Sequence, residues 1–475
     1  MISAILAAVW QAAVWVAKGA SIWALAARTA IMVGASYLLN QALQNSSSDS
    51  ESADTHVWSP QTTEGQGGAI QATYGTNRVH ANIVGHYLVI GSANAIVANS
   101  AVTRVVLACF GEGPIEQPDE DTLRINDRPF SDFTGVTTEW RLGTVDQTVL
   151  DDWTTFRQDY NVGEALEYNK PVTQTLPWTG YDEIEVHLKF PNGLIHYGTD
   201  GDKHSEPVSL KIEMGDAVAN TWKTIFNGEV SGKTAQAAWL KYVSSGTYTG
   251  GSPLTITSTM QPRVRVTLTS TISTNTRHIR DVEFISVQAR RNVAFRHPGM
   301  VLLSLGLLPT ESIANGISEL SVVTTGQIVA DGSGGFGTSR YHADAIRDIL
   351  TQPMIEGAGT VGDPWTASYY RGVDPSRLTG AGWSAQKTLA DTLVPDGLGN
   401  NVEMLRCDVV CDHETSVYDA IDAIGASGRC GLAYIGRDFG LWTDSPRTPA
   451  GILCDGNCER GSISLVPIPH GNLAG

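Results

Sequence analysis

The chain has 475 residues, of which 17% are charged, 8% are aromatic and 49 are Gly. Low charge with many Gly and aromatic residues excludes a disordered chain and a coiled coil. The net charge of −17 excludes a nucleic-acid-binding surface over the whole protein, because such surfaces are basic. Residues 1–44 contain only Lys18 and Arg28 as charged residues, so the remaining 431 residues carry a net charge of −19.

Residues 1–50 are predicted to form an apolar helical arm followed by a polar linker. The first cation is Lys18, so the basic start of a secretory signal peptide is missing. Three alternatives remain: a helix buried against other subunits, a segment that enters a membrane only transiently, and a permanent membrane anchor. The side chains expected to insert in a membrane or to plug the axis of an assembly are Trp10, Trp15, Trp23, Leu38 and Leu39.

Residues 51–296 alternate between apolar and polar side chains in short runs, which indicates a strand-rich region. The segment AQAAWLKYVSS predicts a short inserted helix near 235–245. Residues 297–337 are predicted as a β segment that returns to the preceding sheets. The clearest strand candidates lie at 82–91, 103–111, 181–190, 208–214, 263–272 and 281–289.

Residues 338–475 are predicted to form an α+β unit. Amphipathic helices are expected at 339–352 and 383–394, followed by a strand, a helix and two further strands. Five of the six Cys residues lie in this part of the chain. Thiols on the apolar face of a strand are typical of a core, and Cys407, Cys411 and Cys430 are the expected core thiols. A metal site and a disulfide, with Cys454 and Cys458 as the best pair, remain alternatives.

No motif points to catalysis or to a cofactor. The segment NGEVSGKT at 227–234 lacks the first Gly of a phosphate-binding loop, because Asn227 occupies that position. The 11 His residues are scattered and form no HExxH pair, and no GxSxG elbow is present. We therefore predict a protein without catalytic, cofactor-binding or metal residues.

Several segments, taken in chain order, resemble the N-terminal half of the tip attachment protein J family of lambda-like tailed phages. CFGEGPIEQP at 109–118 is similar to the family's SEGPIEGP signature, with Gly111, Gly113 and Pro114 at its turn. Residues 122–147 end in a RxGxxxQ-like pattern. The other similar segments are 227–234 with Gly232, GISELSVVTTGQIV at 316–329, IRDILTQPMIEGAG at 346–359, and 393–446, which begins with the turn of Pro395, Asp396 and Gly397.

The resemblance implies a mainly β, multidomain tail-hub architecture with β-barrel-like domains, an α+β C-terminal unit and the N-terminal apolar helix. It implies a homotrimer that contacts the distal tail protein, other tail-tip proteins, the C-terminus of the tape-measure protein and a separate fibre. The family's fibronectin-like modules and receptor-binding fibre are expected beyond the segments matched here. Host-receptor binding is therefore not carried over to this chain.

The expected function is that of a structural virion protein, assembled in the host cytoplasm and located at the tail tip. It would close the tail tube and open for DNA ejection, with transient contact to the host membrane. DNA would pass through without specific binding, because an acidic passage does not hold phosphates. The alternatives are a tail-associated cell-wall hydrolase and a membrane-anchored β-rich cellular protein.

Overall fold

The computed structural model describes residues 70–271, 275–294, 296–308, 317, 319–411 and 416–445, all within one compact unit. The N-terminal arm, with Trp10, Trp15, Trp23, Leu38 and Leu39, lies outside the described residues. Strands dominate the described part, which confirms the mainly β prediction. No helix among the described residues has the length and apolar character needed to cross a membrane.

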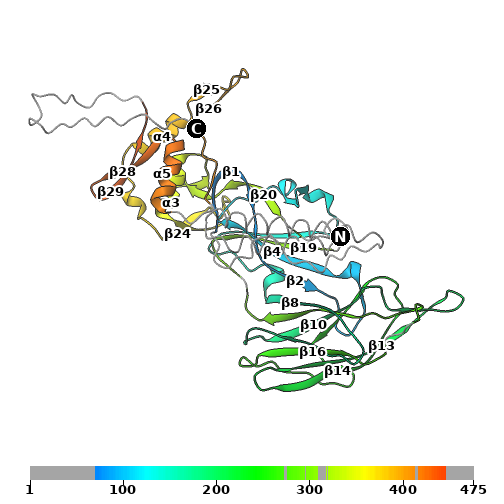
Figure 1. Ribbon diagram of the computed structural model, residues 1–475. Coiled ribbons are helices and arrows are strands. Elements are labelled where there is room, and N and C mark those ends of the chain that lie inside the picture. The colour runs from blue at the N-terminus through cyan, green and yellow to red at the C-terminus, as the bar shows by residue number, and fades with distance from the viewer. Residues whose placement is uncertain are drawn as a thin grey trace, which may run out of the picture. The chain divides into compact units, whose positions relative to one another are not determined.

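Two antiparallel sheets form a sandwich in the middle of the chain (Figure 1). Their inner faces share one cluster of buried side chains, which includes Phe190, Leu210, Phe226 and Phe284. The first sheet has the strand order β3 (Val97–Ala98), β15 (Ala238–Val243), β10 (Glu183–Phe190), β18 (Glu283–Arg291) and β8 (Phe156–Ala165). The second has the order β14 (Thr221–Gly232), β13 (Glu206–Asp216), β16 (Pro262–Leu268) and β9 (Val172–Thr175).

Strand β16 shows why these segments form a sandwich. Its side chains alternate between buried and half-buried positions, with Val264, Val266 and Leu268 on the inner face. A period of two places every second side chain on the same face of a strand, so one face joins the core and the other meets solvent. Strand β10 is buried on both faces, because it lies in the centre of its sheet and meets further structure on its outer side.

The helix predicted near 235–245 is wrong, since the structure has strand β15 at Ala238–Val243. Leu240 pairs with Leu188 and Tyr242 pairs with Val186 on strand β10, and both side chains are fully buried. Alternating burial and cross-strand pairing with a central strand outweigh the helix propensity of the Ala-rich start.

A third sheet lies on the outer side of the sandwich and is joined to it by buried polar contacts. The backbone N–H of Leu88 in β2 (Asn82–Val89) donates to the carboxylate of Asp159 in β8 at 2.9 Å, and the side chain of Gln288 in β18 donates to the carbonyl of Leu88 at 3.0 Å. Because buried polar groups are costly without partners, these bonds fix how the sheets meet. The third sheet has the order β2 (Asn82–Val89), β4 (Thr103–Glu112), β19 (Met300–Leu307) and β7 (Thr137–Leu142).

A fourth sheet combines strands from distant parts of the chain. Its order is β27 (Val409–Cys411), β1 (Ala72–His80), β20 (Leu320–Gly326), β5 (Arg124–Ile125) and β6 (Arg128–Pro129). A small three-stranded sheet has the order β12 (Lys203–His204), β11 (Ile195–Tyr197) and β17 (His278–Ile279). All of these sheets are open with two edge strands, which corrects the expectation of closed, barrel-like domains.

The C-terminal part combines three helices with short hairpins (Figure 1). Helices α3 (His342–Thr351), α4 (Gly382–Ala390) and α5 (Val417–Ser427) bury apolar side chains in one cluster with Tyr74 of β1 and Leu441 of β29. The hairpins are β21–β22 (Ile328–Ala330, Phe336–Thr338), β23–β24 (Pro353–Glu356, Thr366–Tyr370), β25–β26 (Leu393–Pro395, Asn401–Glu403) and β28–β29 (Cys430–Ile435, Asp438–Thr443).

Candidate functional site

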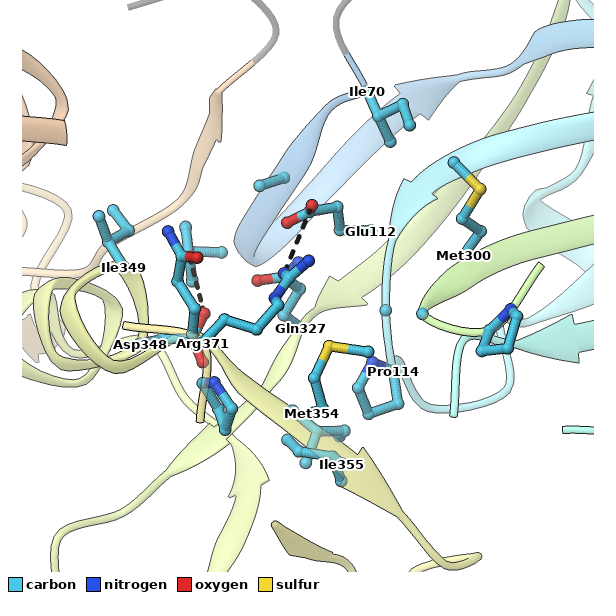
Figure 2. A pocket seen from close by; sticks show the side chains of 18 residues that line it. Ile70, Glu112, Pro114, Met300, Gln327, Asp348, Ile349, Met354, Ile355 and Arg371 are labelled. Carbon is cyan, nitrogen blue, oxygen red and sulfur yellow. Dashed lines mark hydrogen bonds and ion pairs between the residues drawn. The ribbon is translucent and has the colours of Figure 1, made fainter. Parts of the chain in front are cut away.

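A pocket of about 400 Å³ lies where the fourth sheet meets helix α3 and hairpin β23–β24 (Figure 2). Five segments line it, and they are separated by up to 300 residues in the chain. They are the start of β1, the turn after β4, the loop before β19, the step from β20 to β21, and the stretch from α3 to β24. Such a convergence of distant segments makes this pocket the candidate functional site.

Three of the family-like segments meet in this pocket. Gly113 and Pro114 come from the segment at 109–118, Gln327 from the segment at 316–329, and Pro353 from the segment at 346–359. The backbone N–H of Ile328 donates to the carbonyl of Pro114 at 2.8 Å, so the first two segments are bonded directly. Motifs that are dispersed in the sequence thus form one structural junction, which we call the motif junction (residues 112–114, 327–328 and 348–355).

The RxGxxxQ-like pattern supports the motif junction from outside. A Cβ atom at Gly143 would lie 2.5 Å from the Cα atom of Gly113, so the two backbones can approach this closely only as glycines. The side-chain oxygen of Gln147 accepts from the N–H of Gly143 at 2.8 Å, and its amide donates to the carbonyl of His297 at 2.7 Å. Gln147 therefore fixes the loop before β19 that lines the pocket.

Asp348 of helix α3 is the main buried charge of the pocket. Burial raises its pKa to about 7, and the hydroxyl of Tyr74 donates to its carboxylate at 2.8 Å. Burial also raises the pKa of Tyr74 well above its usual value, so the phenol stays protonated and keeps donating. Asp348 therefore changes its protonation state near neutral pH, with a partner that stabilises its charged form.

An ion pair also lines the pocket. Glu112 and Arg371 point toward one another, with 3.9 Å between Oε1 and Nη2 (Figure 2). Both side chains are about half exposed, so this ion pair contributes little to stability. Apolar side chains of Met300, Met354 and Ile355 line another part of the wall.

The described residues lining this pocket include no Ser, Cys, His or Lys, and its polar groups are the carboxyls of Asp348 and Glu112, the phenol of Tyr74, the amides of Gln327 and Gln352 and the guanidinium of Arg371. A protonated carboxyl, a phenol and apolar walls can bind a chain segment or hold two parts of the protein together. Sequence reasoning placed Gly113 and Pro114 but missed Asp348 and Tyr74. The helical spacing from Ala345 to Asp348 could have shown that this aspartate lies on the buried face.

The other predicted turns do not line the pocket, and of these Gly111 directly precedes Glu112 of its lining. Gly111 has a φ of +123°, and a Cβ atom there would lie 2.4 Å from the carbonyl oxygen of Gln71. Gly232 ends strand β14, where it pairs with Glu206 of β13. Pro395, Asp396 and Gly397 form the turn of hairpin β25–β26, in which Asp396 accepts from the N–H groups of Leu398 and Asn400.

The predicted core thiols lie in or beside the C-terminal core. Cys407 and Cys430 are buried in the cluster with α3, α4 and α5, and Cys411 is half-buried against it. Cys407 and Cys430 are free thiols, and burial raises the pKa of Cys407 to about 12 and that of Cys430 to about 11. Such thiols are protonated and unreactive at neutral pH. Cys454 and Cys458 lie outside the described residues.

Sequence reasoning also missed a cluster of His196, Glu206 and His278 near the small three-stranded sheet. These residues come from three segments of the chain that the sheet topology brings together. No spacing pattern in the sequence indicates this cluster, because its members lie 10 and 72 residues apart.

The fold is thus that of a mainly β, multi-sheet protein with a sandwich and an α+β C-terminal part. Residues 157–292, which form most of the sandwich, match the family model of the FNIII-A domain of tip attachment protein J. This match covers less than a third of the chain and shows that this part is similar to a domain of a phage tail-tip protein. The resemblance implied fibronectin-like modules only beyond the matched segments. The family match instead indicates a fibronectin-type domain at residues 157–292.

Other comparisons add little. No curated protein matches the chain. Among solved structures, the VP2 subviral particle of infectious bursal disease virus has 10% identity and a TM-score of 0.14, with 53% of this chain and 65% of that chain covered. A Gx strain structure of the same virus has 10% identity and a TM-score of 0.08, with 53% and 67% covered. The chain spans about two thirds of these structures, and similarity this low carries no argument.

Proposed function

We propose that this protein is the central hub of a long-tailed phage, a homotrimer that closes the tip of the tail tube and opens for DNA ejection. The match of residues 157–292 to the FNIII-A domain of tip attachment protein J carries this proposal. The motif junction adds support, because segments similar to this family throughout its hub part meet in one pocket. A structural role without enzymatic activity follows from the same family.

Exposed apolar side chains support assembly into an oligomer. Tyr418 of α5, Tyr434 of β28 and Trp442 of β29 are between 49% and 59% exposed, and Leu398 at the tip of hairpin β25–β26 is 87% exposed. Large apolar side chains that gather on a surface are typical of protein–protein interfaces. We propose that neighbouring copies, the distal tail protein, other tip proteins and the tape-measure C-terminus cover such surfaces.

The acidic charge supports a passage for DNA. Residues 45–475 carry the net charge of −19, and a passage of the same sign as DNA does not retain phosphates. In this proposal the N-terminal arm is buried on the tail axis until ejection and then reaches the host envelope. A separate fibre would carry receptor binding.

The test is the number of copies in the assembled tip. Native mass spectrometry of the purified full chain should give three copies, and electron microscopy should show a threefold particle at the end of the tail tube. A monomer that clears cell-wall material in a zymogram would overturn the hub proposal in favour of a hydrolase.

A further inference from the structure

The cluster of His196, Glu206 and His278 has the composition of a metal site. Each residue offers one ligand atom, and these three atoms all lie within 4.8 Å of one another. Two imidazole nitrogens and one carboxylate oxygen form a ligand set that zinc uses, with the fourth position left to water. The described residues contain only this one group of His, Cys, Asp and Glu with such spacing.

The two imidazole rings are held side by side by strand pairing. His196 of β11 lies opposite His278 of β17, and the rings stack with centroids 4.0 Å apart and planes inclined by 9°. Neutral imidazole is the form that binds a metal ion.

Glu206 is the buried member of the cluster, and its two oxygens face different partners. Its Oε2 lies 2.8 Å from Nδ1 of His278, and its Oε1 lies 3.3 Å from Nη1 of Arg280. Arg280 thus holds the carboxylate in place from the side opposite His278. Outer contacts of this kind orient the ligands of metal sites.

The cluster has to rearrange to accept an ion. Two ligand atoms on one tetrahedral zinc ion lie roughly 3.4 Å apart, given bonds of about 2.1 Å, so the widest separation in the cluster, within 4.8 Å, has to shorten by up to roughly 1.4 Å. The stacked rings, whose planes are inclined by 9°, also have to turn so that their nitrogen lone pairs meet at one point. His196 and His278 are half-buried, so the ion has a route from solvent.

The backbone around the cluster connects it to the glycine of a family-like segment. Glu206 pairs with Gly232 across strands β13 and β14, and the N–H of Leu194 donates to the carbonyl of Thr234 at 2.8 Å. The segment that resembles a phosphate-binding loop therefore packs behind this cluster and positions it. Its role here is structural.

We propose that His196, Glu206 and His278 bind a divalent transition-metal ion of the zinc type. The ion joins β13 to β11 and β17, which belong to another sheet and pair with each other at only two positions. Binding to the folded state alone would stabilise this part of the FNIII-A domain. The site is independent of whether the chain is a tail hub.

The test uses the untagged full chain, stripped of metal with EDTA and titrated with Zn²⁺ against a chromophoric chelator. The wild-type protein should bind Zn²⁺, and its melting temperature should rise with added Zn²⁺. His196→Ala and His278→Ala should each weaken this binding by at least about tenfold and abolish the thermal shift. Glu206→Gln should do the same, with circular dichroism to verify its fold because Glu206 is buried.

His80→Ala is the matched control. His80 pairs with Glu319 at 3.0 Å and thus offers the same His–Glu contact, but no described third ligand lies near it. This variant should bind Zn²⁺ like the wild type. Equal affinity in the wild type, His196→Ala and His278→Ala would overturn the proposal, as would a wild type that binds no Zn²⁺. The cluster would then be an ion-paired group only.

Discussion

At the scale of single residues, burial decides the chemistry of the candidate site. Asp348 is an ordinary acid in the sequence, yet its place under Tyr74 raises its pKa to about 7. Gly113 is a turn residue in the sequence, yet its contact with Gly143 leaves no room for a side chain. Both effects depend on partners far away in the chain.

Asp348 makes stability depend on pH. The folded protein holds the proton up to about pH 7, whereas the unfolded chain releases it near pH 4. Stability from this group is therefore full below about pH 4 and is lost as the pH rises toward 7. Asp348→Asn lacks this loss, so it should gain about 4 kcal/mol relative to wild type between pH 4 and 8.

Urea unfolding across this pH range measures the effect of Asp348→Asn. The exposed Asp146→Asn is the control, and its stability should follow that of the wild type at each pH. Parallel pH curves for wild type and Asp348→Asn would show that the carboxyl does not titrate near neutrality.

Gly113 should not tolerate a side chain. A Cβ atom there would lie 2.5 Å from the carbonyl oxygen of Leu142 and 2.7 Å from the Cα atom of Gly143, and backbone atoms cannot rotate away. We expect Gly113→Ala to lower the free energy of unfolding by about 2–3 kcal/mol, measured by chemical denaturation. Gly337→Ala, where no heavy atom lies within 4 Å, should change it by less than about 0.5 kcal/mol. Equal values for both would refute the packing of the motif junction.

At the scale of elements, caps and pairing decide which segments form helices or strands. Helix α5 begins after Ser416, whose hydroxyl accepts from the N–H of Asp419 at 3.1 Å and donates to its carboxylate at 2.6 Å. This reciprocal cap is visible in the sequence. By contrast, β15 is a strand because strand β10 lies beside it, which the sequence around 235–245 does not show.

Removal of the cap should weaken helix α5. Ser416→Ala leaves the N–H of Asp419 without its partner, and we expect a loss of about 1 kcal/mol. Hydrogen exchange of the α5 amides should speed up accordingly. Thr388→Ala is the control, because its exposed hydroxyl only donates back to the carbonyl of Ser384 within α4, and it should change stability by less than about 0.5 kcal/mol. Unchanged exchange in Ser416→Ala would mean that packing alone holds α5.

At the scale of the whole molecule, residues 1–44 carry a net charge of +2 and residues 45–475 carry −19. This division leads to two predictions. Deletion of residues 1–44 should leave tail assembly intact but block DNA delivery, because in the proposed function the arm acts only at ejection. Infectivity and electron microscopy of phage with the truncated protein measure both steps. Normal ejection would refute a membrane role for the arm, and failed assembly would show that the arm is structural.

The passage of the assembled hub should be lined by acidic and neutral side chains. Residues 45–475 contain 49 acidic against 30 basic residues, and a negative lumen lets DNA slide past. A reconstruction of the tail tip with side chains resolved would measure this lining. Rings of Lys and Arg facing the lumen would contradict the prediction.

The sequence by itself determined the mainly β class, the helices α3, α4 and α5, and the order of the family-like motifs. These features rest on local patterns: alternation in β16, apolar spacing in α3 and the cap of α5 are all contained within a few neighbouring residues. Of the family-like motifs, the one at 227–234 lies within residues 157–292, which match the family model.

Only the tertiary structure decided where these patterns meet. Residues 238–243 form a strand, and the sheets are open. Three motifs meet around Asp348, and the rings of His196 and His278 stack. The physical reason is that burial, pairing and close backbone contact arise between residues far apart in the chain. Their energies depend on a neighbour that no local pattern in the sequence identifies.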